Sequence, residues 1–169
     1  MIKAILCVDK QGAIGQNGDM PWGRSFPKDL AYFKKVTLYR DVVVGRTTYE
    51  SLPFNRKGFP QRDTLVLTSG NGGAILGDGE AVYFMSKGGL LDAINDSEYD
   101  IWIAGGSTVY EQFWDLVDEV HITTIDKIYP EADTFFKPDL TNFEDTLQCT
   151  QVGNGEVDAE VRVWRRKGL

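Results

Sequence analysis

The chain has 169 residues, a length that suits one domain with a sizeable core. Its composition, 42% hydrophobic and 12% aromatic, is that of a globular protein and excludes a disordered chain. The net charge of −7 argues against nucleic acid or an anionic membrane as the main partner. The start, MIKAILCVDKQGAIG, lacks the apolar core of a secretory leader, and no run is long enough to span a bilayer. We therefore expect a cytoplasmic protein with a single domain over residues 1–169.

Few residues suggest metal or nucleophilic chemistry. Cys7 and Cys149 have no metal-like or redox-like spacing, so we expect two reduced thiols and no metal site. The single histidine, His121, falls in a strand pattern beside Thr123. We expect a partly exposed structural histidine there and not a general acid.

Strand and helix patterns alternate along the first two thirds of the chain. The expected strands are 2–8, 41–44, 64–68, 81–85, 101–104 and 119–125, and the expected helices are 27–39, 48–51, 89–95 and 108–116. Short apolar strands such as DVVVG and IWIAGG are typical of a parallel sheet that is covered on both faces. The last third has strand signals, including 160–164, without intervening helices. The pattern predicts an α/β fold with a mostly parallel central sheet, helices on both faces and an antiparallel C-terminal edge.

Asp29 is an unusual residue in the helix expected at 27–39. It lies four residues before Phe33 and seven before Val36, so it projects from the same helical face as these apolar residues. Because Pro27 suits the first helical position, Asp29 also falls in the first turn, where an acid stabilises the helix dipole. The residues alone leave both a structural and a functional role open.

The strand end in IWIAGGSTVYEQF has features of an anion site. Ligands of open α/β sheets bind beyond the carboxyl ends of the strands. Gly105 and Gly106 would let a ligand approach the backbone, and Ser107 or Thr108 would cap the following helix. Paired glycines alone are weak evidence, because tight strand-to-helix turns use glycine in any case.

A second strand end, DVVVGRTTYES, has related features. Arg46 follows Gly45 at a helix start, where a cation is disfavoured unless an anion binds there. Thr47 or Thr48 would cap this helix. Two such ends suggest a dinucleotide, although the GxGxxG spacing of a Rossmann fingerprint is missing.

In combination, these segments resemble the dihydrofolate reductase family over nearly the full chain. The family's segments occur in order as AIGQNGDMPW, FPKDLAYFK, VVVGRTTYES, LVLTS, IAGGSTVYEQF and VHITTID. The resemblance implies a single dihydrofolate-reductase-like domain that reduces 7,8-dihydrofolate to 5,6,7,8-tetrahydrofolate by hydride transfer from NADPH. It further implies a role in one-carbon metabolism and in thymidylate and purine synthesis. A monomer without nucleic-acid or membrane partners is expected.

The resemblance also assigns roles to individual residues. Asp29 would anchor the pterin, Thr123 would hydrogen-bond this acid, and Met20 and Trp22 would belong to a loop that closes over the nicotinamide. The implied catalytic set is Asp29, Trp22, Met20 and Thr123. The implied substrate-binding set is Ile5, Leu6, Cys7, Asp29, Phe33, Leu52, Phe59, Arg62 and Thr123, in which Arg62 would clamp the glutamate carboxylate of folate. The implied cofactor-binding set is Cys7, Ile14, Gly45, Arg46, Thr47, Thr48, Thr68, Ser69, Ala104, Gly105, Gly106, Ser107, Thr108, Val109 and Tyr110.

Two alternatives remain at this point. One is a related reductase such as the riboflavin-pathway domain, against which the GDMPW segment, Asp29 and Arg62 argue. The other is a non-catalytic protein that kept the fold, against which the intact Asp29, Arg46, Gly105 and Gly106 argue.

Overall fold

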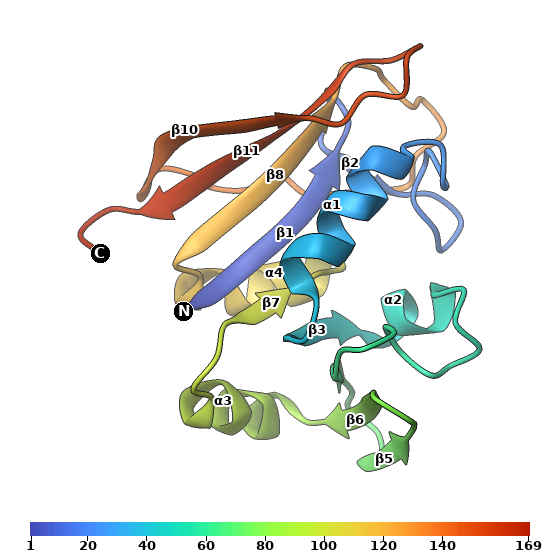
Figure 1. The fold of residues 1–169 in the computed structure, drawn as a ribbon, viewed down its shortest axis with the longest axis vertical. Coiled ribbons are helices and arrows are strands. Elements are labelled where there is room, and N and C mark those ends of the chain that lie inside the picture. The colour runs from blue at the N-terminus through green and yellow to red at the C-terminus, as the bar shows by residue number, and fades with distance from the viewer. The chain divides into compact units, whose positions relative to one another are not determined.

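The computed structural model describes residues 1–169, and its elements fall into two units (Figure 1). The first unit comprises Met1–Ile2 and Thr37–Leu116, and the second comprises Lys3–Val36 and Val117–Leu169. The expectation of one domain over residues 1–169 stays a prediction.

The first unit is built on five strands in the order β7-β3-β4-β6-β5. Its elements are β3 (Asp41–Gly45), α2 (Arg46–Ser51), β4 (Thr64–Leu67), β5 (Gly73–Leu76), β6 (Ala81–Met85), α3 (Lys87–Asp96), β7 (Ile101–Ile103), α4 (Ser107–Phe113) and the 3-10 helix η1 (Trp114–Leu116). Neighbouring strands pair in parallel except β5, which pairs antiparallel with β6. Since Val42, Val43 and Val44 of β3 are all fully buried, both faces of this strand are covered.

The second unit has four strands in the order β10-β11-β8-β1 and a two-stranded ribbon of β2 and β9. Its elements are β1 (Ile2–Val8), β2 (Ala13–Gly15), α1 (Pro27–Thr37), β8 (Glu119–Ile125), β9 (Thr134–Phe135), β10 (Phe143–Gln151) and β11 (Ala159–Arg166). β1 and β8 are parallel, whereas β11 is antiparallel to both β8 and β10. The predicted α/β fold with mostly parallel strands and an antiparallel C-terminal edge is confirmed.

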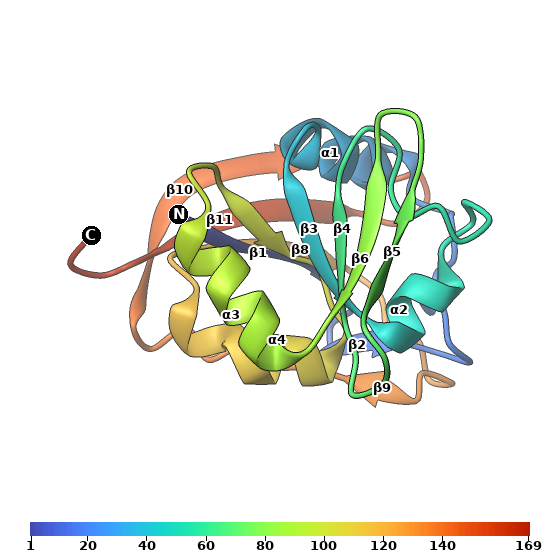
Figure 2. The ribbon, with the colours of Figure 1, turned by 90° about the horizontal axis from the view of Figure 1, so that it is seen from below.

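The helices of the first unit lie along its parallel strands. α4 contacts β3 and β7, α2 contacts β3 and β4, and α3 contacts β4 and β6 (Figure 2). Each of these helices follows a strand of the same sheet, and the carboxyl ends of β3, β4 and β7 therefore lead into neighbouring turns. This arrangement gathers the predicted cofactor-binding segments of this unit at one edge of its sheet.

Several predicted boundaries differ from the structure. The first helix ends at Thr37 and not at residue 39, because Tyr39 has a left-handed backbone with φ 60°. The patterns missed β2, β5, β9 and β10. β5 is exposed along its whole length, and β10 is mostly exposed and interrupted by a bulge in which Leu147 has φ 66°. Such strands lack the apolar alternation on which strand prediction depends.

Gly58 lies at a closely packed position of the first unit, and its substitution tests that packing. It has φ +73°, and a Cβ there would lie 2.5 Å from Oγ1 of Thr64 and 2.9 Å from Cγ2 of Val82. Gly79 has a similar backbone, with φ +90°, but no atom near a built Cβ. We expect Gly79→Ala to cost about 1–2 kcal/mol of backbone strain, and Gly58→Ala to cost about 1–3 kcal/mol more because of overpacking. Urea unfolding of both variants measures this difference, and equal losses would contradict it.

Candidate functional site

The Asp29 carboxyl forms a hydrogen bond in the second unit. The hydroxyl of Thr123 on β8 donates to Oδ1 of Asp29 on α1 over 2.6 Å. Thr123 is 3% exposed, and Cys7 lies directly opposite it in the register of β1 and β8. The contact predicted between Thr123 and the acid is therefore present.

The protonation of this group follows from its surroundings. Burial raises the pKa of Asp29 above its ordinary value, and hydrogen bonds from Thr123 and Cys7 partly offset this rise. Burial, together with the nearby Asp29 carboxylate, also raises the pKa of the Cys7 thiol well above its ordinary value. Cys7 therefore stays a thiol that can donate to Asp29, and it has little thiolate reactivity.

The segment that contains Met20 and Trp22 is anchored on the second unit. Trp22 is buried with Phe26 and Ile125 in an apolar cluster, against which Met20 and Cys7 also pack. The ring of Trp22 meets that of Tyr129 edge to face, with centroids 5.5 Å apart. Trp22 thus holds one end of the predicted loop on the core.

Asp133, which was not among the predicted residues, fixes the other end of this loop. Its Oδ2 accepts from the backbone N–H of Asn17 over 2.8 Å, and its own N–H donates to the carbonyl of Gly15. A Cβ at Gly15 would lie 2.9 Å from Cβ of Thr134, so glycine is required at this position for close approach to β9.

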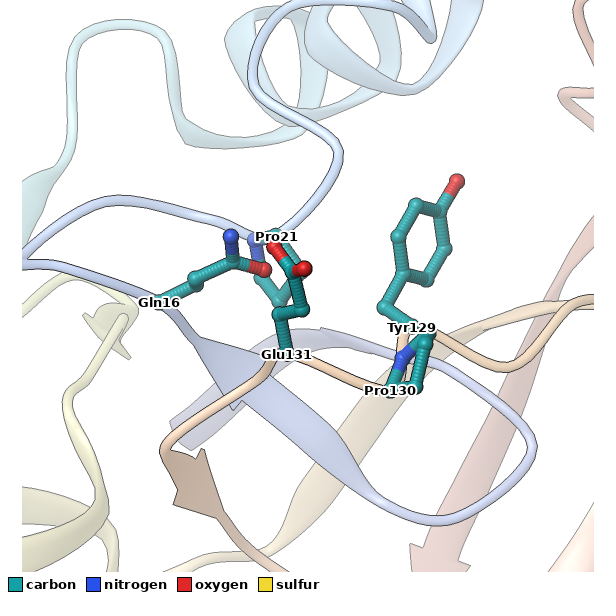
Figure 3. A pocket seen from close by; sticks show the side chains of 5 residues that line it. All are labelled: Gln16, Pro21, Tyr129, Pro130 and Glu131. Atoms are coloured by element: carbon teal, nitrogen blue, oxygen red, sulfur yellow. The ribbon is translucent and has the colours of Figure 1, made fainter.

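An open hollow of about 220 Å³ lies beside this loop (Figure 3). It is lined by Gln16, Pro21, Tyr129, Pro130 and Glu131. None of these side chains belongs to the predicted catalytic, substrate-binding or cofactor-binding sets, so we assign the hollow no role.

The remaining predicted pocket residues of the second unit lie on or near β1 and α1. Ile5 and Leu6 are buried in β1, whereas Phe33 on α1 and Ile14 on β2 are partly buried. Phe33 follows Asp29 by four residues on α1, so both project from one side of the helix.

The two glycine-containing strand ends meet in the first unit. The N–H of Gly45 at the end of β3 donates to the carbonyl of Gly105 after β7 over 2.8 Å. A Cβ at Gly45 would lie 3.1 Å from Val109, and one at Gly106 would lie 3.5 Å from Oγ1 of Thr48. The starts of α2 and α4 therefore lie side by side, as expected for neighbouring parallel strands.

The predicted helix caps at these two ends are wrong. Gly45 is the N-cap of α2 and Gly106 is the N-cap of α4, and neither helix start has a side-chain cap hydrogen bond. Because glycine caps both helices, no cap side chain covers their first turns. Close packing favours glycine at position 45, where a Cβ would lie 3.1 Å from Cγ2 of Val109, whereas a Cβ at position 106 would make only an ordinary contact of 3.5 Å with Thr48.

Other predicted cofactor residues border these turns. Thr68 follows β4 and its hydroxyl accepts from the N–H of Gly70 over 3.1 Å, while Ser69 beside it is exposed. The ring of Tyr110 lies against Gly105, because a Cβ there would approach its hydroxyl to 3.2 Å. The other predicted residues around these turns are Thr47, Ala104, Ser107 and Thr108, of which Thr47 and Thr108 are exposed.

Arg46 already has a partner in the structure. Its Nε donates to Oε1 of Glu50 one turn along α2 over 3.0 Å, and its guanidinium lies 5.5 Å from the ring centroid of Phe84. Both members of the ion pair are about half exposed, so the contact is weak and can exchange with another anion. Glu50 was not among the predicted residues.

Arg62 is buried and oriented by the first unit. Its Nε donates to the carbonyl of Pro60 over 2.9 Å and its Nη1 to the hydroxyl of Thr37 over 3.0 Å. The guanidinium also lies 5.1 Å from the ring centroid of Phe59. Burial lowers the pKa of Arg62 below its usual value, but a guanidinium remains charged at neutral pH. Of the other predicted wall residues, Phe59 is buried and Leu52 ends α2.

The expectation of a partly exposed His121 is wrong. Its side chain is buried in β8, and Nδ1 lies 2.6 Å from the hydroxyl oxygen of Tyr32 on α1. Tyr32 was not among the predicted residues, although its spacing of three residues from Asp29 places both on one side of the helix.

No group of three or more His, Cys, Asp or Glu side chains is arranged to hold a metal ion. None of the helices combines the length and the apolar character needed to cross a membrane.

Comparisons with known proteins agree with this geometry. The sequence profile of the dihydrofolate reductase family matches residues 1–166. The chain is 34% identical over 154 residues to the dihydrofolate reductase of Mycoplasma genitalium, covering 85% of this chain and 87% of that protein. It is 31% identical over 139 residues to that of Bacillus subtilis, covering 79% and 77%.

A solved structure gives the same result. The dihydrofolate reductase from Enterococcus faecalis, complexed with NADP(H) and RAB-propyl, superposes with a TM-score of 0.83 at 30% identity, covering 99% of this chain and 96% of the other. The sequence and fold therefore define an oxidoreductase of the α/β class. The chain belongs to the dihydrofolate reductase family.

The pKa of Asp29 predicts an effect on stability. Because this pKa is higher in the folded state than its ordinary value of 3.8, the neutral carboxyl favours folding. This contribution is complete below pH 3.8 and is lost as the pH rises through the folded pKa. We expect Asp29→Asn to be more stable than the parent at neutral pH by about 0.5–2 kcal/mol. Urea unfolding of the variant and the parent at a series of pH values below 7 should show that this difference in the free energy of unfolding decreases as the pH falls.

Asp139 provides a control, because its pKa is shifted in the opposite direction to that of Asp29. It is exposed, and hydrogen bonds from the hydroxyl and N–H of Thr141 lower its pKa. Its stabilising contribution is present at neutral pH and is lost as the pH falls, so Asp139→Asn should not stabilise the protein at pH 7. A loss of stability in both variants would contradict the assignment for Asp29.

Proposed function

We propose that this chain reduces 7,8-dihydrofolate to 5,6,7,8-tetrahydrofolate with NADPH and thereby supports one-carbon metabolism and the synthesis of thymidylate and purines. Membership of the family and the NADP(H) complex of the similar enzyme from Enterococcus faecalis support the reaction and the cofactor. The observation that carries the proposal is the partly buried Asp29 carboxyl with its bond to Thr123.

Asp29 would anchor the pterin. A carboxylate has two oxygens with about four acceptor positions, so the 2.6 Å bond from Thr123 to Oδ1 leaves capacity for a ligand. The aminopyrimidine edge of a pterin presents two nearly parallel N–H donors, which match a carboxylate. Ile5, Leu6, Cys7 and Phe33 would form apolar contacts with the same ring.

Arg62 would bind the glutamate carboxylate of the substrate. Its bonds to Pro60 and Thr37 fix the plane of the guanidinium. A planar guanidinium held in one orientation suits bidentate recognition of a carboxylate. Phe59 and Leu52 would line the channel for the rest of the tail.

The strand ends of the first unit fit NADPH. Glycine at both helix caps lets a ligand approach the backbone, and Arg46, Thr47 and Ser69 supply donors for phosphate oxygens. The other cofactor residues would be Ile14, Thr48, Thr68 and those of the segment 104–110. When bound, NADPH supplies the hydride for the imine carbon of dihydrofolate.

The protein's contribution to this step is orientation and proton supply. Fixing the substrate in one orientation lowers the barrier by removing its freedom to move. Met20 and Trp22 would exclude bulk water and admit one water as proton donor to the imine nitrogen. The negative charge of Asp29 would favour the protonated pterin.

The physiological form that we propose is a cytoplasmic monomer. The net charge of −7 supports small-molecule ligands rather than nucleic acid or an anionic membrane as partners. Sedimentation equilibrium of the purified chain tests the monomer.

Loss of the near-ultraviolet absorbance of NADPH on addition of dihydrofolate tests the reaction. We expect turnover by the parent and a fall of about 10²–10⁴-fold in single-turnover hydride transfer for Asp29→Asn at neutral pH. The variant should partly recover as the pH falls, because solvent then protonates the substrate. NADPH affinity should stay near that of the parent. A parent without turnover would overturn the proposal, and parental rates in the variant would remove Asp29 from the mechanism.

Cofactor choice depends on Arg46. A charge-assisted hydrogen bond contributes about 1.5–3 kcal/mol, so Arg46→Ala should weaken NADPH binding by about ten-fold or more and leave NADH binding nearly unchanged. Lys57→Ala is a matched control, because it removes one exposed positive charge from the same unit. Fluorescence titration with both cofactors measures the effect. Equal weakening of NADPH and NADH would show that Arg46 does not contact the 2′-phosphate.

A further inference from the structure

Two hydrogen bonds connect helix α1 to strand β8. The first joins Thr123 and Asp29 over 2.6 Å. The second joins Nδ1 of His121 and the hydroxyl oxygen of Tyr32, also over 2.6 Å. The rings of Tyr32 and His121 are in addition tilted against each other, with centroids 5.9 Å apart. Both contacts lie inside the second unit.

The spacing of the four residues places these two hydrogen bonds at successive positions along α1 and β8. Asp29 and Tyr32 are three residues apart on the helix, a rise of about 4.5 Å. Thr123 and His121 are two residues apart on one face of the strand, about 6.6 Å. As residue numbers rise along α1 they fall along β8, so the two elements run in opposite directions. Two hydrogen bonds at different points along α1 resist its rotation about Thr123 more strongly than one bond would.

Glu119 lies beside Nε2 of His121. Nε2 of His121 lies 3.4 Å from Oε1 of Glu119, an ion-pair distance longer than that of a good hydrogen bond. Glu119 also pairs with Lys3 over 3.2 Å and with Arg165 over 3.6 Å. The contact with His121, and the charge of Lys3, lower the pKa of Glu119 to about 2 despite its burial. Glu119 is therefore ionised at every pH at which the enzyme would be assayed.

The other polar groups on this face are known from the register. Lys3 and Cys7 on β1 lie opposite Glu119 and Thr123, and Arg165 on β11 also lies opposite Glu119. Burial, with the charges of Glu119 and Asp29, raises the pKa of Tyr32 to about 12. Tyr32 therefore keeps its hydroxyl proton and can take part in the hydrogen bond at neutral pH.

We propose that Tyr32 and His121 are positioning residues for the substrate anchor: their hydrogen bond, with Glu119 beside the histidine ring, fixes the rotation of α1 and thereby orients the Asp29 carboxyl. This inference rests on the proposed role of Asp29. Neither residue would touch the reacting atoms. Without the bond between Tyr32 and His121, α1 can rotate and the bond from Thr123 to Asp29 weakens.

Three variants test the hydrogen bond between Tyr32 and His121. Tyr32→Phe removes the hydroxyl and keeps the ring. His121→Leu removes both ring nitrogens, whereas His121→Gln keeps one acceptor for Tyr32 and one donor for Glu119. Thr146→Val is the control, because it removes a different partly buried hydrogen bond of the same unit, from Thr146 to the carbonyl of Val163.

Kinetics give the first measurement. Tyr32→Phe and His121→Leu should weaken dihydrofolate binding and slow single-turnover hydride transfer, each by about two- to ten-fold, the change expected for one hydrogen bond. NADPH affinity should stay within about two-fold of the parent, and His121→Gln should restore most of the loss. A fall in thermal stability with parental kinetics, as expected for Thr146→Val, would overturn the proposal for Tyr32 and His121.

A titration that does not depend on turnover gives the second measurement. The bond from Thr123 lowers the pKa of Asp29, so its weakening should raise the Asp29 pKa, as followed by carboxyl-carbon nuclear magnetic resonance. The rise is expected in Tyr32→Phe and His121→Leu, and not in His121→Gln or Thr146→Val. An unchanged Asp29 titration in Tyr32→Phe, or equal rises in the two His121 variants, would overturn the positioning role even if the parent proved inactive toward dihydrofolate.

Discussion

The hydrogen bond from Thr123 to Asp29 is the contact on which the proposed chemistry depends. A carboxyl buried without a partner would lose its charge or destabilise the fold. Here the hydroxyl of a buried strand residue satisfies one oxygen over 2.6 Å, and the Cys7 thiol gives further support. The acid remains costly to bury, which is the usual condition of a functional group held ready for a ligand.

The order of the parallel strands determines where the glycine turns lie. Because β7, β3 and β4 are neighbours, their carboxyl ends deliver Gly105, Gly45 and Thr68 to one edge of the first unit's sheet. The turns are closely packed: Gly45 bonds to Gly105 over 2.8 Å, and a Cβ at Gly45 or at Gly105 would lie 3.1 or 3.2 Å from a neighbouring side chain. In the proposed cofactor site, the same glycines would let a phosphate approach the backbone. The packing of the turns and the proposed ligand contact would then depend on the same positions.

The polar contacts beneath α1 join fold and site in a different way. Tyr32 and His121 cross from helix to sheet beside the pair formed by Asp29 and Thr123. Apolar packing positions a helix by shape and tolerates small rotations, whereas a hydrogen bond of 2.6 Å is lost after a shift of about 1 Å. A polar contact beside the anchor thus provides directional control that apolar packing does not give.

The sequence by itself determined the parallel strands, the helix with Asp29 in its first turn and the glycine turns, because these follow from local periodicity and backbone preference. It did not determine β10, whose polar, bulged sequence becomes a strand only beside β11, or the caps of α2 and α4. The tertiary structure also decided that His121 is buried against Tyr32 and that Arg46 pairs with Glu50. Burial and pairing of a side chain depend on residues far apart in the chain, such as Tyr32 and His121, which are 89 positions apart, and no local pattern records them.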